Sequence, residues 1–345
     1  MRAAFLTDIR QVKVKQTAPP TIQQPTDVLL RVRKVGVCGS DTHYFRTGRI
    51  GDQVVEFPFT IGHECVATVE AVGSGVKNLQ VGRRVAVDPL RWCNECDQCL
   101  AGRFHTCRNQ QFLGCPGQAA GCMADYTVMP EQSCYVLPDG VSDDQAVLVE
   151  PFAIALWATK LAGDLSGKTV GILGAGPIGL CVSEACRAAG AETVYMTEIR
   201  DDRIEKAKAF KPDWIGNPHH CDVVAEIVQR QPLKLDCVFE CAGEQVTLDQ
   251  GLDMIKPGGK LLIVGIPEVD RVSFRMDTMR RNEITVQPVR RQNECTDEAI
   301  ELVRSGKVNL DPMVTHHYPL EAAQRAYQIV ADYDDGAVKV IIEVS

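Results

Sequence analysis

Four cysteines lie within one short segment of the chain. Cys93, Cys96, Cys99 and Cys107 follow the pattern C-x2-C-x2-C-x7-C. Four thiolates at this spacing can surround one tetrahedral ion, and because the set has no histidine and no open position, we expect a structural zinc site. A four-thiolate iron–sulfur cluster is the alternative, although there the last spacing is three residues rather than seven. Ligand type and spacing together favour zinc.

A second group of potential metal ligands is dispersed along the chain. Cys38 opens the segment Cys-Gly-Ser-Asp-Thr-His, His63 and Glu64 stand side by side, and Glu150 follows much later. One thiolate, one imidazole and one carboxylate leave the fourth position of a zinc ion to water or substrate, as a catalytic site requires. The sequence therefore predicts two zinc ions per chain, one structural and one catalytic.

A third motif is typical of dinucleotide binding. The segment Gly174-Ala175-Gly176-Pro177-Ile178-Gly179 is a G-x-G-x-x-G between a predicted strand (168–173) and a predicted helix (177–189). Its glycines permit a tight turn, close approach of a pyrophosphate and close helix–strand packing, and the helix N-terminus faces the phosphates. Glu198 ends the next predicted strand, where an acid accepts hydrogen bonds from a ribose diol. This favours NAD over NADP, while Arg200 and Arg203 keep NADP as the less favoured alternative.

The elements that must position these residues are of two kinds. Residues 1–150 contain short β-branched runs at 28–35, 66–72, 84–88 and 126–129, separated by glycines and prolines, which predicts an irregular β-rich unit. From about residue 156, strands at 168–173, 193–198, 235–240, 260–266 and 284–289 alternate with helices such as 177–189 and 201–210. This alternation predicts βαβ units and a parallel sheet. Helices at 295–304 and 320–330 and a strand at 337–343 close the chain.

Composition limits the class of protein. A chain of 345 residues has the length of two ordinary domains, and 45% hydrophobic with 24% charged residues is the balance of a soluble globular protein. The net charge of −8 argues against nucleic acid as a partner. No signal peptide and no apolar run of about 18 residues is visible, so we expect no membrane partner. Fifteen cysteines without a secretory signal indicate reduced thiols and a cytoplasmic protein.

Together these residues resemble the zinc-dependent medium-chain dehydrogenase/reductase family, the alcohol dehydrogenase superfamily. The resemblance rests on GVCGSDTHYF at 36–45, GHE at 62–64, the four-cysteine segment, LVEP at 148–151 and GAGPIG at 174–179. The segment 43–64 is most similar to the sorbitol (polyol) dehydrogenases. The resemblance implies an α/β protein: a GroES-like β-rich catalytic domain (1–155 and 290–345) and a Rossmann domain, a doubly wound parallel sheet that binds NAD (156–289). The active site would lie between the domains.

The resemblance also implies roles for single residues. Cys38, His63 and Glu64 match the catalytic zinc ligands, and Glu150 matches a carboxylate that contacts the metal or holds its water. Because adjacent residues of a regular strand point in opposite directions, His63 and Glu64 need a bend between them or must bind one at a time. Which glutamate lies closer to the metal stays open. The family's usual glycine three residues after Glu64 is Ala67 here.

The implied reaction is hydride transfer from a secondary alcohol to the nicotinamide, which gives a ketone. Ser40 and His43 match the family's proton relay. Further residues implied beside the cofactor are Cys241, Val264, Gly265 and Ile266. Candidate substrate residues are Tyr44, Arg49 and Arg290; with Arg46 and Arg291, these arginines leave a charged substrate open.

The expected substrate is a polyol, a cyclitol or a sugar acid. The alternative function is that of an L-threonine 3-dehydrogenase, which has the same zinc and relay pattern. The second alternative is a nucleotide-binding relative without turnover. By resemblance we expect a homo-oligomer, with a tetramer favoured.

Overall fold

The computed structural model describes residues 1–345 and divides them into two compact units. Unit 1 comprises Met1–Glu150, Thr296–Ser305 and Val314–Ser345, and unit 2 comprises Pro151–Cys295 and Gly306–Met313. These boundaries differ from the expected 155/156 and 289/290. Helix α3 (Asp143–Ala162) is continuous, so that the chain changes unit inside a helix, with no loop to mark the place in the sequence.

Unit 1 is built on a seven-stranded sheet with the order β12-β8-β7-β3-β20-β19, and β11 also pairs with β3. Its strands are β3 (Asp27–Gly36), β7 (Glu64–Val72), β8 (Arg84–Val87), β11 (Tyr126–Pro130), β12 (Cys134–Val136), β19 (Val314–Pro319) and β20 (Lys339–Glu343). The C-terminal strand β20 lies antiparallel to β3, with Ile342 opposite Val35. The end of the chain therefore belongs to the same core as the beginning, as the resemblance implied.

Smaller elements complete unit 1. A three-stranded sheet orders β2 (Gln11–Gln16), β1 (Arg2–Asp8) and β6 (Phe59–Thr60), and two-stranded sheets pair β4 (Arg49–Ile50) with β5 (Gln53–Val54) and β9 (Leu90–Arg91) with β10 (Gln111–Phe112). The helices are α1 (Gly39–Thr47), α2 (Asp97–Leu100), α9 (Thr296–Arg304) and α10 (Ala323–Ala331). Phe45 of α1 and Tyr327 of α10 have their ring centroids 5.8 Å apart in the buried core, which joins the two helices.

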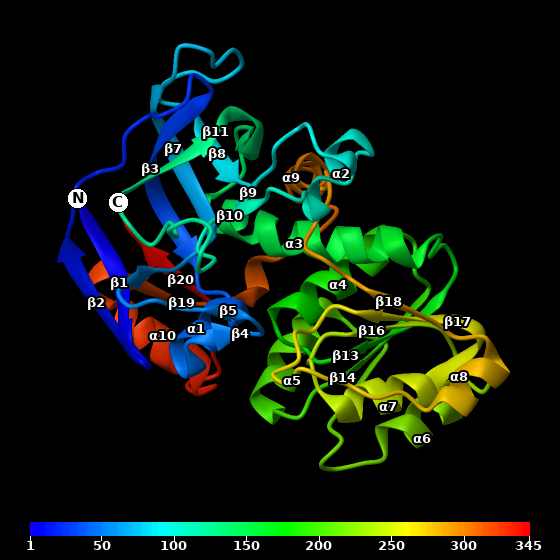
Figure 1. Cartoon of the computed structure of the whole chain (residues 1–345). Coiled ribbons are helices and arrows are strands. Elements are labelled where there is room, and N and C mark those ends of the chain that lie inside the picture. Colours follow the sequence, from blue (N-terminus) through cyan, green and yellow to red (C-terminus); the bar gives the residue numbers. More distant parts are fainter. The chain divides into compact units, whose positions relative to one another are not determined.

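Unit 2 is a doubly wound α/β unit. Its parallel sheet has the order β15-β14-β13-β16-β17-β18, so the direction of strand addition reverses between β13 and β16. The strands are β13 (Thr169–Leu173), β14 (Thr193–Thr197), β15 (Trp214–Gly216), β16 (Leu235–Glu240), β17 (Ile255–Ile263) and β18 (Thr285–Pro288). The helices α4 (Pro177–Ala188), α5 (Asp201–Ala207), α6 (Val223–Arg230), α7 (Gln245–Met254) and α8 (Met276–Asn282) accompany it (Figure 1).

Helix α3 corrects one expectation. By length and composition alone it could cross a membrane, although the sequence suggested that no stretch would qualify. The structure buries 67% of its apolar window inside the protein, as in the core helix of a soluble protein. The sequence pattern did not predict this helix. Its apolar residues occupy all faces and give no helical period, and Pro151 lies inside it.

Candidate active site

Helix α1 positions the first group of site residues. Cys38 is its N-cap residue with extended backbone (φ −88°, ψ 151°), and its side chain caps no backbone N–H. Ser40 lies in the first turn, and its hydroxyl donates to Cys38 Sγ at 3.3 Å. His43 follows three residues later, on the same face of the helix, and is partly exposed.

The backbone turns at Gly62, one residue before His63 and not between His63 and Glu64. Gly62 adopts φ +101°, a left-handed backbone that favours glycine, and the regular strand β7 begins only at Glu64. As a result the ligand atoms of Cys38, His63 and Glu64 all lie within 4.8 Å of one another. Ala67 lies fully buried in β7 opposite Val32, and the strand continues past it.

Asp41 orients the imidazole of His63. Its Oδ1 lies 3.3 Å from His63 Nδ1, and neither carboxylate oxygen has a hydrogen-bond partner. This contact leaves Nε2 for a metal ion, the usual arrangement in which a carboxylate fixes a ligating histidine. Burial opposes a charge on His63, but Asp41 and Cys38 outweigh burial and raise the pKa of the imidazole well above its usual value. The cluster therefore favours a cation at this point.

Glu64 has a partner that the sequence did not reveal. Lys339 of β20 places Nζ 2.6 Å and 2.8 Å from the two carboxylate oxygens, and both side chains are 1% exposed. The two residues are 275 positions apart in the chain. Glu64 is thus one member of a buried ion pair, and its position is fixed from the C-terminal strand.

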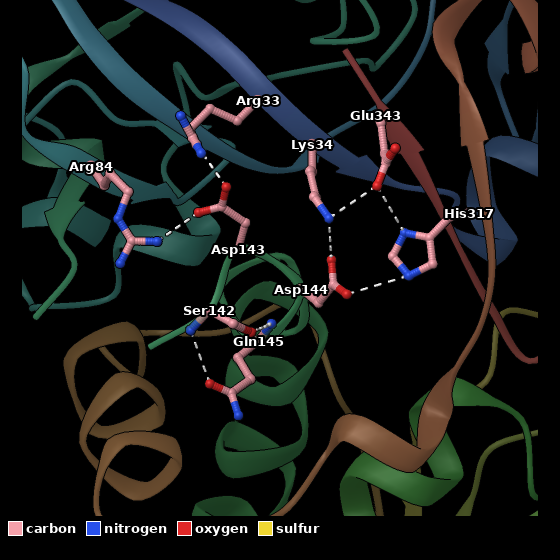
Figure 2. Close-up of polar contacts among 9 residues, drawn as sticks. All are labelled: Arg33, Lys34, Arg84, Ser142, Asp143, Asp144, Gln145, His317 and Glu343. Atoms are coloured by element: carbon pink, nitrogen blue, oxygen red, sulfur yellow. Dashed lines mark hydrogen bonds and ion pairs between the residues drawn. The ribbon is translucent and has the colours of Figure 1, made fainter. Parts of the chain in front are cut away.

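Glu150 reaches the site from the second turn of α3, and the start of that helix is strongly anchored (Figure 2). Asp143 accepts from Arg33 at 2.7 Å and from Arg84 at 2.6 Å. Asp144 accepts from Lys34 at 2.8 Å and contacts His317 at 3.3 Å. These pairs join the helix to β3, β8 and β19, and they fix the direction in which it carries Glu150.

The Glu150 carboxyl itself is buried, and its Oε2 has no hydrogen-bond partner. Burial raises its pKa to about 7; His63 opposes that shift and Glu64 adds to it. Glu150 is therefore close enough to interact with the cluster although it is not one of the three residues whose ligand atoms meet. Its unpaired oxygen is the acceptor left over for a water, an alcohol or a metal.

The four-cysteine segment forms a compact lobe around α2. Sγ–Sγ distances are 3.9 Å (Cys93–Cys99), 3.6 Å (Cys96–Cys99), 3.9 Å (Cys96–Cys107) and 3.5 Å (Cys93–Cys107). A zinc ion bonded to four sulfurs at about 2.3 Å requires edges of about 3.8 Å, so this donor set fits a tetrahedral ion. The backbone N–H of Arg108, followed by that of Cys99, lowers the pKa of Cys96 to about 6, which favours the thiolate that a metal needs.

Unit 2 contains a cradle for a dinucleotide at the end of β13. Gly174 has φ +106°, and a Cβ on Gly179 would lie 1.9 Å from Gly174 O, so this turn and packing require glycine. A Cβ on Gly176 would meet only Arg203 Nη1, at 3.5 Å, so the backbone is open to a ligand on that side. Gly176 also leaves the N-terminus of α4 without a side-chain cap, and Pro177 begins the helix. Uncapped N–H groups at this point suit a pyrophosphate.

Glu198 lies beside this turn as predicted from its place after β14. Its Oε2 accepts from Ala175 N at 2.9 Å and its Oε1 from Arg200 N at 3.1 Å, so the acid is fixed against the glycine turn. Cys241, Val264, Gly265 and Ile266 follow β16 and β17 at the same edge of the sheet. Backbone contacts there are close, since a Cβ on Gly174 would lie 3.3 Å from Ala242 N.

The candidate substrate residues are not brought together within unit 1. Tyr44 is 4% exposed, and its hydroxyl donates to Gln53 Oε1 at 3.0 Å and lies 4.0 Å from Cys115 Sγ. Arg49 is exposed in β4, and Arg290 is an exposed residue of unit 2. Sequence reasoning missed Asp41 and Lys339; Asp41 lies within the quoted 36–45 motif, whereas no signal marks Lys339.

Comparison with known proteins agrees with this geometry. Residues 24–139 match the "Alcohol dehydrogenase GroES-like domain" family and residues 177–305 the "Zinc-binding dehydrogenase" family. The chain is 35% identical to a sorbitol dehydrogenase of Bacillus subtilis (99% of this chain, 97% of the relative) and 34% identical to an L-idonate 5-dehydrogenase of Vitis vinifera (92% and 87%). A putative zinc-binding dehydrogenase from Sinorhizobium meliloti, solved with NADP, superposes with a TM-score of 0.90 at 28% identity (99% of both chains). The chain therefore belongs to the zinc-dependent medium-chain dehydrogenase family and is an oxidoreductase with zinc and NAD(P) as its cofactors.

Proposed function

We propose that the protein oxidises a secondary hydroxyl of a polyol or sugar acid to a ketone and reduces NAD to NADH with release of one proton. The observation that carries this is the meeting of Cys38, His63 and Glu64 within 4.8 Å, beside the unpaired oxygen of Glu150. Three ligands with an open fourth position are typical of catalytic rather than structural zinc. The names of the relatives, sorbitol and L-idonate dehydrogenases, support the substrate class.

Each residue of the cluster has a role in this reaction. Cys38, His63 and Glu64 hold the metal, and Asp41 and Lys339 hold His63 and Glu64 in turn. Zinc, when bound, supplies the Lewis acid that lowers the pKa of an alcohol, and NAD accepts the hydride. Glu150 orients the reacting hydroxyl or its water through Oε2.

The proton leaves through Ser40 and His43. Ser40 Oγ lies 3.3 Å from Cys38 Sγ, next to the reacting centre, and His43 lies one helical turn further on and is partly exposed. Two groups on one face of a short helix can pass a proton from a buried hydroxyl towards solvent. Ser40→Ala should therefore slow turnover more than it weakens NADH binding.

NAD is the preferred cofactor of the two. The carboxylate of Glu198 is held by the backbone N–H of Ala175 in the glycine turn and by that of Arg200, so it cannot swing away from a 2′-phosphate. Like charge would oppose NADP there, although Arg203 at Gly176 supplies one compensating cation. We further propose, from family membership, a cytoplasmic homo-oligomer, with a tetramer favoured.

The test is NADH formation over a panel of hexitols, pentitols, inositols, aldonic acids and L-threonine, each with NAD and with NADP. We expect turnover of a polyol or an aldonic acid with NAD. Preference for an acid over the matched neutral polyol would assign Arg49 or Arg290 to the substrate. Turnover of L-threonine alone would contradict the proposal, as would turnover with NADP alone.

A further inference from the structure

A buried carboxyl in unit 2 has no role in the chemistry described so far. Glu240 is the last residue of β16, the second of the two strands between which the sheet order reverses. It lies opposite Leu173, the residue just before the glycine turn, and is 1% exposed. Ligands of doubly wound sheets bind at this reversal, beyond the carboxyl ends of the strands. Glu240 therefore lies at the edge of the sheet where the dinucleotide would bind, but it is buried beneath the protein surface there.

The side chain and the backbone of Glu240 hold two different loops. Its Oε1 accepts from Ala242 N at 2.8 Å, Gly243 N at 2.7 Å and the Thr247 hydroxyl at 2.8 Å, which closes the turn between β16 and α7. Its backbone carbonyl accepts from Val264 N at 2.8 Å and Gly265 N at 2.9 Å, at the end of β17. One residue thus fixes both segments that follow the neighbouring strands.

These two loops touch each other and the glycine turn with bare backbone. A Cβ on Gly243 would lie 2.6 Å from Ile266 O, and one on Gly265 would lie 2.4 Å from Gly243 N and 2.7 Å from Glu240 Oε2. A Cβ on Gly174 would contact Ala242 N at 3.3 Å. Because the three segments are in close contact, a shift of the 241–243 turn is passed on to Gly174.

We propose that Glu240 is a positioning residue of the dinucleotide site, which sets cofactor affinity by fixing the 241–243 turn and the 264–266 segment against the glycine turn. The proposal rests on the proposed use of NAD. Glu240 Oε2 has no hydrogen-bond partner, so the carboxyl is not needed to satisfy any group outside these loops. Burial raises its pKa, and the Thr247 hydroxyl and the backbone donors oppose that shift.

The test measures the Kd of NADH by fluorescence, with KM for NAD and for the alcohol, in Glu240→Ala, Glu240→Gln and Thr247→Val. Glu240→Ala should raise the Kd of NADH and the KM for NAD about tenfold or more, because three hydrogen bonds are lost. The KM for the alcohol should stay within about twofold of the wild-type value. Glu240→Gln retains the acceptor and should stay within about threefold of the wild type. Thr247→Val removes one donor and should lie between them.

Glu184→Gln is the matched control. Glu184 is a partly buried carboxyl group of the same unit that accepts from Asn309 N at 3.2 Å, and α4 carries it away from the glycine turn. This variant should lower the melting temperature without changing the Kd of NADH. The inference would be overturned if Glu240→Ala only loses stability, as the control does, and still binds NADH with the Kd of the wild type. If Glu240→Ala does not fold, an unchanged Kd in Thr247→Val would overturn it. A wild type that binds neither NADH nor NADPH would overturn both this inference and the proposed function.

Discussion

The two candidate zinc sites of unit 1 are built on opposite plans. The four-cysteine lobe takes all its ligands from Cys93 to Cys107, and its sulfurs contact one another within that one segment. The other cluster takes Cys38 from a helix end and His63 and Glu64 from a bend before a strand, and it depends on partners as distant as Lys339. A closed site can be made by a short loop, whereas an open site needs a rigid surround to keep its ligands in place.

The largest expected effect separates the sites by function. Cys38→Ser should lower turnover about a thousandfold or more, because the open site loses its thiolate ligand and its metal. The Kd of NADH should be unchanged, since the glycine turn lies in unit 2. Kinetics, metal analysis and NADH fluorescence on one preparation check this. Full turnover with one zinc ion per chain would show that the open cluster is not the catalytic centre.

Cys96→Ser should have the reverse effect. The lobe should lose its ion and the melting temperature should fall by about 5–10 °C, while turnover of the folded fraction stays within a few-fold of the wild type. Calorimetry with metal analysis checks the loss. If the purified wild type is brown and contains iron and acid-labile sulfide, the lobe holds a cluster rather than zinc.

Lys339→Met tests whether the open site depends on distant support. Removing one member of a fully buried ion pair leaves an unpaired charge on Glu64, at a cost of about 3–5 kcal/mol in the free energy of unfolding. The double variant Lys339→Met with Glu64→Gln should recover part of that loss. Urea unfolding of the wild type, Lys339→Met, Glu64→Gln and the double variant gives the coupling energy, and additive effects would mean that the pair does not hold the site.

A smaller effect concerns the anchor of α3. Arg33 and Arg84 hold the pKa of Asp143 below its usual value although burial opposes this, so the folded state binds its proton less readily than the unfolded state. The stabilisation of the folded state by the Asp143 carboxylate is therefore present above the unfolded pKa of about 3.9. It is lost as the pH falls through the lower pKa of the folded state. Asp143→Asn should cost about 1–2 kcal/mol at pH 7, with the difference from the wild type shrinking towards about pH 3. A difference that does not change with pH would contradict the assigned charge pairs.

What the sequence predicts well is local. The glycine motif and the four-cysteine spacing each lie within one short segment, and the structure has a tight turn and four close sulfurs there. For His63 and Glu64 the sequence left two possibilities open, a bend between them or binding one at a time, and the turn that the structure has lies at Gly62, before both residues. Lys339 was not, since a lysine in an apolar strand gives no sign of a carboxylate 275 residues away. Strand β19, with the mixed sequence VTHHYP, was also missed, because its partly exposed residues lack a clear alternation.

The pairing of Glu64 with Lys339 also has a consequence for synthesis on the ribosome. The four cysteines of the lobe have all been translated by residue 107, so that site can form while most of the chain is still being made. Glu64 emerges early as well, but its counter-charge lies on β20, the last strand in the order of elements. The nascent chain therefore carries Glu64 without its counter-charge until β20 joins β3, so this pair forms late in the order of synthesis.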